Sequence, residues 1–410
     1  MAKPILMIGA FDTKGEEYAF LRSEIITRGQ RVMAVNTGVM GSTKLFPVDV
    51  EAEEVARAGG GDLKALREKK DRGEAMAVMS KGAEVVVKRL FEQGKFDGII
   101  GMGGSAGTAI VTAAMRGLPL GVPKVCVSTM ASGNTSPYVG AKDVVLFPSI
   151  VDVAGINRIS RIIISRAAGA ICGMVEGMAD KNVRPTEDRP IIAATMFGNT
   201  TECVNACREA LTKAGYEVLV FHATGVGGRT MESLVEEGLV DGVLDITTTE
   251  WADEVAGGVM SAGTDRLSAP GRKGVPHLIV PGCVDMANFG PMESVPEKYK
   301  TARRNFYPWN PAVTLMRTNV DENRQMGEIF AKKANVARGP VAFLIPLRGV
   351  SILDGDGQPF CDREADGAMF EAIKRGLRKD ILVVEMDVNI NDSKFAQKAV
   401  QMMLEMVASR

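Results

Sequence analysis

Short runs of apolar residues alternate along this chain with longer segments that show helical periodicity. In the first half the apolar runs are Ile5–Ile8, Arg31–Val35, Gly98–Gly101 and Lys124–Val127. The helical segments are Glu16–Arg28, Glu74–Glu92, Ala106–Met115 and Ile159–Met178. Alternation of short buried strands with helices is typical of parallel sheets built from βαβ units. The pattern therefore predicts an α/β fold with mainly parallel sheets.

A polar stretch with two prolines, Lys181–Pro190, interrupts this alternation and is typical of a linker. Apolar runs then resume at Ile191–Met196, Glu217–Phe221, Gly242–Ile246, His277–Val280, Val313–Met316, Val341–Ile345 and Leu382–Met386. The last helical segment is Ser393–Val407. We therefore expect two domains, residues 1–183 and 184–410, with the alternation of parallel strands continuing through the second.

The two halves look like copies of each other. Phe11 matches Phe197 and Gly29 matches Gly215, each 186 positions apart (197 minus 11 and 215 minus 29). The matches continue in the same order with Asp97-Gly98 and Asp241-Gly242, then with Gly121-Val122-Pro123 and Gly274-Val275-Pro276. Sequences of βαβ units also resemble one another through shared physics, but the one-by-one order favours an internal duplication.

Composition narrows the class of protein. Of the 410 residues, 46% are hydrophobic and 24% charged, as in an ordinary globular chain. The formal net charge of -1 offers no basic surplus for nucleic acid. No apolar stretch approaches the ~18 residues of a membrane span, and the N-terminus has no signal-peptide pattern. Six scattered cysteines fit reduced thiols. We therefore expect a cytoplasmic protein that binds neither nucleic acid nor membrane.

The turn after the first predicted strand, Gly9–Glu16, holds the first candidate residues: Asp12, Thr13 and Lys14. In a parallel sheet this turn precedes a helix, whose free N–H groups and dipole attract anions. Lys14 could bind a phosphate, and Asp12 or Glu16 could hold Mg²⁺. Alternatively, Asp12 or Thr13 could cap the helix, with Glu16 completing a capping box. The sequence leaves both interpretations open.

A second candidate is the turn Gly101–Thr108. Its possible phosphate-binding residues are Gly103, Gly104, Ser105, Gly107 and Thr108. Glycines let a backbone close on a phosphate, and the two hydroxyls can donate to it. The pattern G-x-G-x-x-A also fits a dinucleotide site, but the acidic residue expected about 20 positions on to bind the ribose is missing. A phosphate loop is therefore favoured over an NAD site, and a tight strand-to-helix crossing is the structural alternative. The chain contains no Walker A sequence.

A third loop, Thr129–Thr135, follows the next strand and is rich in small polar residues. Strand order in a parallel sheet predicts that Thr129, Met130 and Ala131 lie beside the Gly103 loop, where both could line one phosphate cleft. A capped turn is an equally good interpretation.

The second half offers further polar strand ends. His222–Thr230 is another glycine-rich turn, in which Arg229 could clamp a carboxylate or phosphate. Since the chain has only two histidines, a metal site made of three histidines is excluded. Asp245, Glu250, Asp285 and Asn288 also follow strands, but spacing does not choose a general acid or base among them. Arg348 precedes Asp354–Gly357, where the EF-hand pattern fails and a turn is expected.

Four motifs in fixed order give the chain a family resemblance. They are Gly9–Lys14, Gly103–Thr108, Phe221–Gly225 and Pro281–Asp285. These motifs resemble those of an uncharacterised family of bacterial and fungal proteins, related to the ATP-binding N-terminal domain of the tomato mosaic virus resistance protein of plants. The resemblance covers essentially the whole chain. It implies two Rossmann-like subdomains, ATP binding and a homo-oligomer, with a dimer as the first expectation.

Together these observations lead us to expect an ATP-binding protein, with Mg²⁺ and with the phosphates held by the glycine-rich loops of the first half. As an enzyme it would transfer a phosphoryl or adenylyl group to a small metabolite, with Arg229 or Arg348 as the anion clamp. The alternative is a nucleotide sensor without catalysis that acts through a partner.

Overall fold

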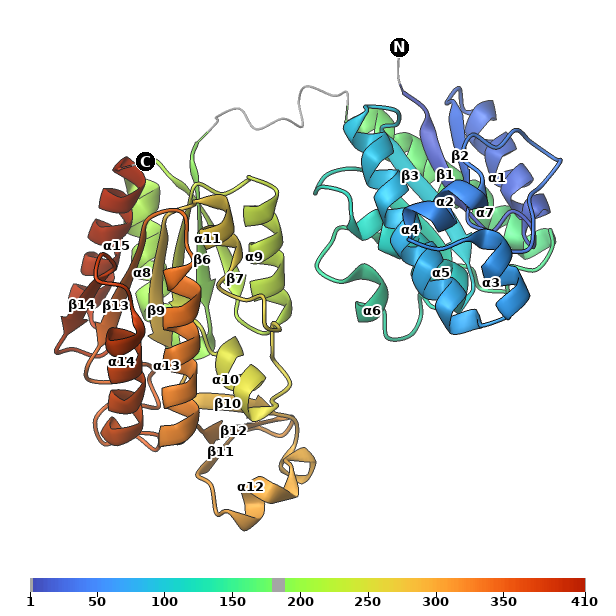
Figure 1. Ribbon diagram of the computed structural model, residues 1–410. Helices are drawn as coiled ribbons and strands as arrows, with labels where there is room; N and C mark the ends of the chain where they lie inside the picture. Colours follow the sequence, from blue (N-terminus) through green and yellow to red (C-terminus); the bar gives the residue numbers. More distant parts are fainter. Residues whose placement is uncertain (1–2, 179–188, 410) are drawn as a thin grey trace. The chain divides into compact units, whose positions relative to one another are not determined.

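The computed structural model describes residues 3–178 and 189–409, and the chain divides into two compact units, 1–186 and 187–410 (Figure 1). The predicted boundary between residues 183 and 184, and most of the predicted linker, lie outside the described residues. Each unit has its own sheet and its own hydrophobic cores.

The first unit is built on a five-stranded sheet in the order β2-β1-β3-β4-β5. Its strands are β1 (Ile5–Gly9), β2 (Val32–Asn36), β3 (Gly98–Gly103), β4 (Lys124–Ser128) and β5 (Val145–Pro148). All neighbouring strands are parallel. The sequence missed β5, because this edge strand is short and only partly buried, so its residues lack the continuous apolar run of the central strands.

Helices cover both faces of this sheet (Figure 1). Ile5 and Met7 face α1 (Gly15–Thr27) and α7 (Arg158–Gly177). Leu6 and Ile8 face the opposite layer, because successive strand side chains point to opposite sides. That layer consists of α2 (Ala52–Ala58), α3 (Leu63–Lys69), α4 (Arg72–Glu92) and α5 (Ser105–Arg116). A short helix, α6 (Ser136–Val139), follows β4.

Tyr18 fixes α1 to the sheet and explains the glycine at the end of β1. Its buried hydroxyl donates to the carbonyl of Ile8 at 2.8 Å and accepts from the N–H of Met102 at 2.7 Å. A Cβ atom at Gly9 would lie 1.8 Å from this oxygen. Gly9 therefore makes room for the tyrosine that joins β1, β3 and α1.

The second unit repeats this topology with one more strand, in the order β7-β6-β8-β9-β13-β14. Its strands are β6 (Ile191–Met196), β7 (Glu217–His222), β8 (Gly242–Thr247), β9 (His277–Gly282), β13 (Val341–Pro346) and β14 (Leu382–Met386), and neighbouring strands are parallel. Equivalent contacts recur as well. The Asp97 carboxylate accepts from the N–H of Lys3 at 3.0 Å, and that of Asp241 accepts from Ile191 at 2.9 Å. The predicted α/β fold with two similar, mainly parallel sheets is confirmed.

Helices again cover both faces. One face packs on α8 (Thr201–Lys213) and α15 (Ser393–Ala408). The other packs on α9 (Val226–Glu236), α10 (Glu250–Ala256), α11 (Ala269–Lys273), α13 (Val320–Asn335) and α14 (Arg363–Gly376).

One predicted strand belongs to a different sheet. Val313–Met316 lies in β12 (Val313–Arg317), which pairs antiparallel with β10 (Met286–Phe289) and β11 (Phe306–Asn310). The prediction that it continues the parallel alternation is therefore wrong, since an apolar run does not reveal the direction of its neighbours. The segment between β10 and β11 carries the 3-10 turn Met292–Ser294 and α12 (Glu297–Thr301), and another 3-10 turn, Gly198–Thr200, precedes α8.

Candidate functional site

The sequence candidates of the first unit lie at the point where its strand order reverses. From β1 the chain crosses to β2 on one side, and β3 lies on the other side of β1. In open α/β sheets, ligands bind outside the carboxyl ends of the strands at such a switch point. The loops that leave β1 and β3 are Ala10–Lys14 and Gly104 with the start of α5.

The start of α5 is open. Gly104 is the N-cap residue and no side chain caps the helix, so the first amides of α5 have no side-chain acceptor. Ser105 is exposed. The N–H of Thr129 donates to the carbonyl of Gly103 at 3.3 Å, which places the third candidate loop, with exposed Thr129 and half-buried Met130 and Ala131, against the second.

The glycines of this turn differ in what surrounds them. A Cβ atom at Gly103 would lie 2.8 Å from the Cα of Gly107, so these two allow the strand and helix to approach closely. At Gly104 the nearest atom would be the Thr129 hydroxyl, 3.8 Å away, which is an ordinary contact. Thr108 is buried, and its hydroxyl lies 2.7 Å from that of Ser128. Thr108 therefore serves packing, whereas a Cβ atom at Gly104 would fit without a clash.

The loop after β1 combines structural contacts with one unsatisfied acid. The Asp12 carboxylate accepts from the N–H of Met40 at 2.8 Å through Oδ2, whereas its buried Oδ1 has no partner in the described chain. Lys14 donates to the carbonyl of Val153, and Thr13 is exposed. The N-cap of α1 is Lys14, so the proposed capping by Asp12 or Thr13 does not occur.

A cavity of about 440 Å³ lies beside this loop. Its walls include Asp12, Thr13, Glu16 and Lys44. Residues 103–108 do not line it.

The glycine-rich turn of the second unit is filled by the protein's own carboxylate. Glu250 Oε1 accepts from the N–H groups of Gly225 at 2.8 Å and Gly228 at 3.0 Å, at the start of α9. A Cβ atom at Gly228 would lie 2.2 Å from this carboxylate. Arg229 is exposed and donates to the carbonyl of Ser261 at 3.0 Å. This turn therefore binds an internal anion.

Glu250 belongs to a buried charge cluster around Arg266, whose side chain is 1% exposed. The guanidinium contacts both oxygens of Asp245, at 2.6 and 2.5 Å, and Glu250 at 2.6 Å. Glu232 lies 3.5 Å away and also accepts from the N–H groups of Leu267 and of Ala269, the first residue of α11, each at 2.6 Å. His277 Nε2 lies 3.2 Å from Asp245. The Arg266 contacts hold the pKa of Asp245 below its ordinary value despite burial.

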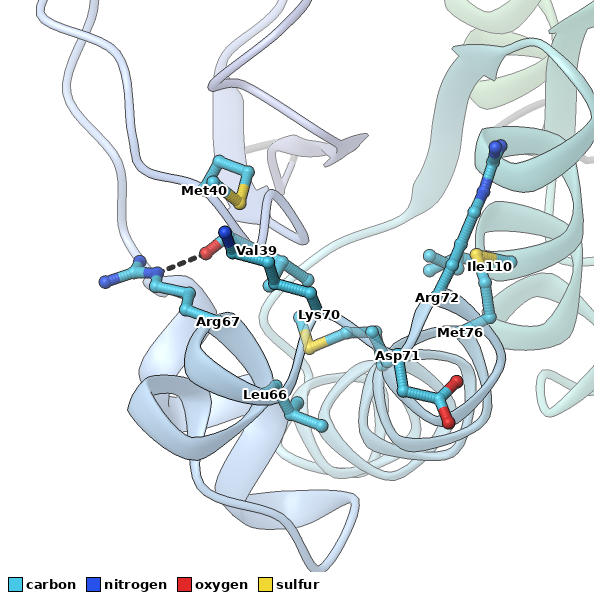
Figure 2. A pocket seen from close by; sticks show the side chains of 11 residues that line it. Val39, Met40, Leu66, Arg67, Lys70, Asp71, Arg72, Met76 and Ile110 are labelled. Carbon is cyan, nitrogen blue, oxygen red and sulfur yellow. Dashed lines mark hydrogen bonds between the residues drawn. The ribbon is translucent and has the colours of Figure 1, made fainter.

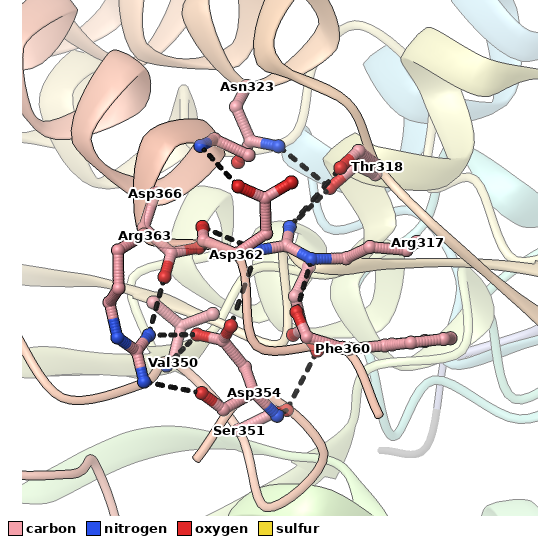
Figure 3. A network of polar contacts seen from close by, with 12 residues as sticks. Arg317, Thr318, Asn323, Val350, Ser351, Asp354, Phe360, Asp362, Arg363 and Asp366 are labelled. Atoms are coloured by element: carbon pink, nitrogen blue, oxygen red, sulfur yellow. Dashed lines mark hydrogen bonds and ion pairs between the residues drawn. The ribbon is translucent and has the colours of Figure 1, made fainter. Parts of the chain in front are cut away.

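A second buried network lies in the same unit (Figure 3). Arg317 binds Asp366 at 2.6 Å and Asp354 at 3.3 Å, and Arg363 binds the same two acids at 2.6 and 3.2 Å. Ser351 donates to Asp285 at 2.8 Å. These contacts tie the end of β12, the loop after β13 and the start of α14 to the loop after β9.

Three carboxylates in this network face two arginines. Burial raises the pKa of Asp285 to about 6, and burial with the nearby charges of Asp285 and Asp366 raises that of Asp354 to about 8. Among the described residues, no group of three or more His, Cys, Asp or Glu side chains converges as metal ligands would. Sequence reasoning selected Asp285 but missed Arg317 and Arg363, because no local motif distinguishes these arginines. The arrangement holds these loops together.

The suggested clamp Arg348 lies at the surface. Its guanidinium pairs with Asp387 at 2.6 Å and with Asp356 at 3.7 Å. The predicted turn at Asp354–Gly357 is present.

Asp253, on α10, gives a prediction about pH. Burial raises its pKa from 3.8 to about 7, and its carboxylate binds the backbone and side-chain nitrogens of Asn288 at 2.9 and 2.7 Å. Because the folded state holds this proton where the unfolded state has lost it, the group lowers the free energy of unfolding progressively from about pH 4 to pH 7. The free energy of unfolding of Asp253→Asn minus that of wild type should therefore increase as the pH rises from about 4 to 7, and should be constant above pH 7. Urea unfolding at several pH values measures this, and parallel curves would contradict the assignment.

The chain is thus a protein of two α/β units whose parallel sheets have similar topology, and the first unit has an uncapped glycine turn at its switch point. It belongs to an uncharacterised protein family, UPF0261, whose N-terminal domain model matches residues 3–180 and whose C-terminal domain model matches residues 189–407. Within the described residues, every helix is too short or too polar to cross a membrane.

Relatives occur in bacteria and plants. A UPF0261 protein of Clostridium tetani is 48% identical over 408 residues, which are 99% of this chain and 100% of that protein. The tomato ToMV resistance protein Tm-1(GCR237) is 44% identical over 338 residues, covering 82% of this chain and 45% of the tomato protein. A UDP-N-acetylglucosamine 2-epimerase structure from Rickettsia bellii aligns with 100% of this chain and 98% of its own, at 11% identity and a TM-score of 0.23. A likeness of that degree says nothing about activity.

Proposed function

We propose that this protein binds ATP with Mg²⁺ in the cytoplasm, with the phosphates at the switch point of the first unit. The observation that carries this proposal is the start of α5, where no side chain caps the helix and a Cβ atom at Gly104 would make only an ordinary contact with Thr129. Free N–H groups at a helix start attract phosphate oxygens, and the helix dipole adds to that attraction. The family resemblance to an ATP-binding domain supports the same ligand.

The surrounding side chains supply matching roles. The exposed hydroxyls of Ser105 and Thr129 donate to phosphate oxygens, and Gly103 and Gly107 keep the turn narrow enough for close approach. Asp12 is the acid that approaches Mg²⁺, because its Oδ1 is otherwise unsatisfied. Lys14 would have to leave the carbonyl of Val153 to reach a phosphate.

Substitution of Gly104 by valine tests the site, because an added Cβ atom there meets no heavy atom closer than 3.8 Å. We expect at least tenfold weaker Mg-ATP binding by calorimetric titration, a loss of about 1.4 kcal/mol or more, because the valine occupies the space that the phosphates approach. The matched control is Gly173→Val on α7, where a Cβ atom meets nothing within 4 Å. Equal affinity in both variants would refute the assignment of the phosphate site.

Two additions sharpen the experiment. Lys14→Ala measures whether the lysine turns toward the phosphates, and an unchanged affinity would remove it from the site. Analysis of the recovered nucleotide separates the two functional classes. ADP or AMP formed with added metabolites indicates phosphoryl or adenylyl transfer, whereas intact ATP indicates a sensor.

A further inference from the structure

A second pocket of the first unit lies on the side of the sheet covered by α4 and α5 (Figure 2). Its volume is about 350 Å³, at the lower end of the range for small-molecule sites. Its apolar lining comes from the loop after β2, from α3, from α4 and from α5. These side chains are Val39, Met40, Leu66, Ala75, Met76, Met79 and Ile110.

The polar lining of this pocket is mainly cationic. It consists of Arg67, Lys70, Arg72 and a single acid, Asp71. Asp71 is engaged as the N-cap of α4, where it accepts from the N–H of Glu74 at 3.0 Å. Arg67 donates to the carbonyl of Val39 and lies 3.7 Å from Glu53. Among the described residues, Lys70 and Arg72 form no ion pair, so the lining carries two cations that no acid contacts directly.

The backbone at Lys70 adds an independent observation. Lys70 ends α3 in the left-handed region, with φ at 55°. Glycine or asparagine is favoured in that conformation, and a long side chain is held there at a conformational cost. The chain therefore keeps a lysine beside the pocket at a position where local structure favours another residue.

We infer that this pocket binds a small hydrophobic carboxylate, with its hydrocarbon or aromatic body among the methionines and its carboxylate toward Lys70 or Arg72, whose charged ends lie on different sides of the pocket (Figure 2). Methionine side chains are flexible and polarizable, so three of them accommodate either kind of body. The apolar wall excludes a fully polar metabolite, and the free cations favour an anion over a neutral molecule.

This site is distinct from the proposed phosphate site. None of the residues assigned to ATP lines the pocket. The two share supporting elements, since Ile110 lies on α5 and Met40 donates through its N–H to Asp12. The inference does not rest on ATP binding, and the two proposals are tested with different ligands and different variants.

The test is calorimetric titration of the full chain with octanoate and with 2-naphthoate, beside the corresponding neutral amides. We expect at least one carboxylate to bind, and its amide to bind at least tenfold more weakly. The double variant Lys70→Gln, Arg72→Gln should lower carboxylate affinity at least tenfold and leave the amide unchanged. Lys64→Gln, an exposed lysine on α3, is the control.

A second variant tests the location of the site. Met40 is 73% exposed, so Met40→Glu leaves the core intact while placing a negative charge at the pocket. It should abolish carboxylate binding, whereas Met292→Glu, at an exposed methionine of the second unit, should not change it. The inference is overturned if neither carboxylate binds, if the amides bind equally well, or if Met40→Glu binds the carboxylate like wild type. It is also overturned if ATP competes directly with the carboxylate and does so equally well in Gly104→Val, because ATP would then occupy this pocket.

Discussion

Replacement of Arg266 by methionine is expected to destabilise the second unit by about 3–5 kcal/mol. The methionine would fill much of the volume but would leave Asp245, Glu250 and Glu232 buried without the cation that joins them. Breaking a buried ion cluster by removing one partner is costly, because the remaining charges stay desolvated. The loss in free energy of unfolding should exceed the loss caused by removing any surface charge of the same unit.

The measurement uses the protein's own fluorescence. The two tryptophans, Trp251 and Trp309, both lie in the second unit, so their emission reports urea unfolding of that unit in the full chain. Arg272→Met is the control, since Arg272 is 49% exposed and pairs with Glu236 at 2.6 Å. An exposed pair of this kind contributes about 0–1 kcal/mol. Equal losses in the two variants would show that the buried cluster contributes no more than a surface pair.

This cluster also shows what the sequence could not predict. Asp245 and Glu250 were recognisable as polar strand ends, and a general acid or base was a reasonable interpretation of each. Their partner Arg266 comes from 21 and 16 positions further along, in a loop without a motif. A charged residue in a sequence predicts exposure, and only the folded chain reveals that these charges neutralise one another.

The sheets, unlike the charge cluster, have a clear signal in the sequence. Strands buried on both faces are continuous apolar runs, and parallel strands need helical crossovers, so β1, β3, β6 and β8 stand out in the sequence. The adjacency of the Gly103 and Thr129 loops followed from that arrangement. The position of the Glu250 carboxylate in the glycine-rich turn His222–Thr230 did not follow from it, because a turn that binds a ligand and a turn that binds a side chain of its own protein have the same glycines.

Substitution of Gly82 by alanine is expected to destabilise the first unit by about 3 kcal/mol, at the upper end for overpacking. Gly82 lies on α4, where an added Cβ atom would be 1.9 Å from the carbonyl oxygen of Val55 on α2. The same close approach of α2 and α4 occurs at Gly59, which ends α2: a Cβ atom there would lie 2.1 Å from the carbonyl oxygen of Val78 on α4. Both obstacles are backbone atoms, so one helix must move away from the other.

The matched control has the opposite expected sign. Gly173 is an exposed position inside α7 of the same unit, so Gly173→Ala should stabilise that unit by about 0.5–1 kcal/mol. Scanning calorimetry of the full chain measures both, with tryptophan fluorescence identifying the transition of the second unit. Because α4 carries Met76 and Met79 into the apolar pocket, a shift of α4 in Gly82→Ala should also weaken carboxylate binding. If Gly82→Ala changed neither stability nor carboxylate binding, the prediction would be contradicted, because α2 and α4 would then move apart without a loss of free energy.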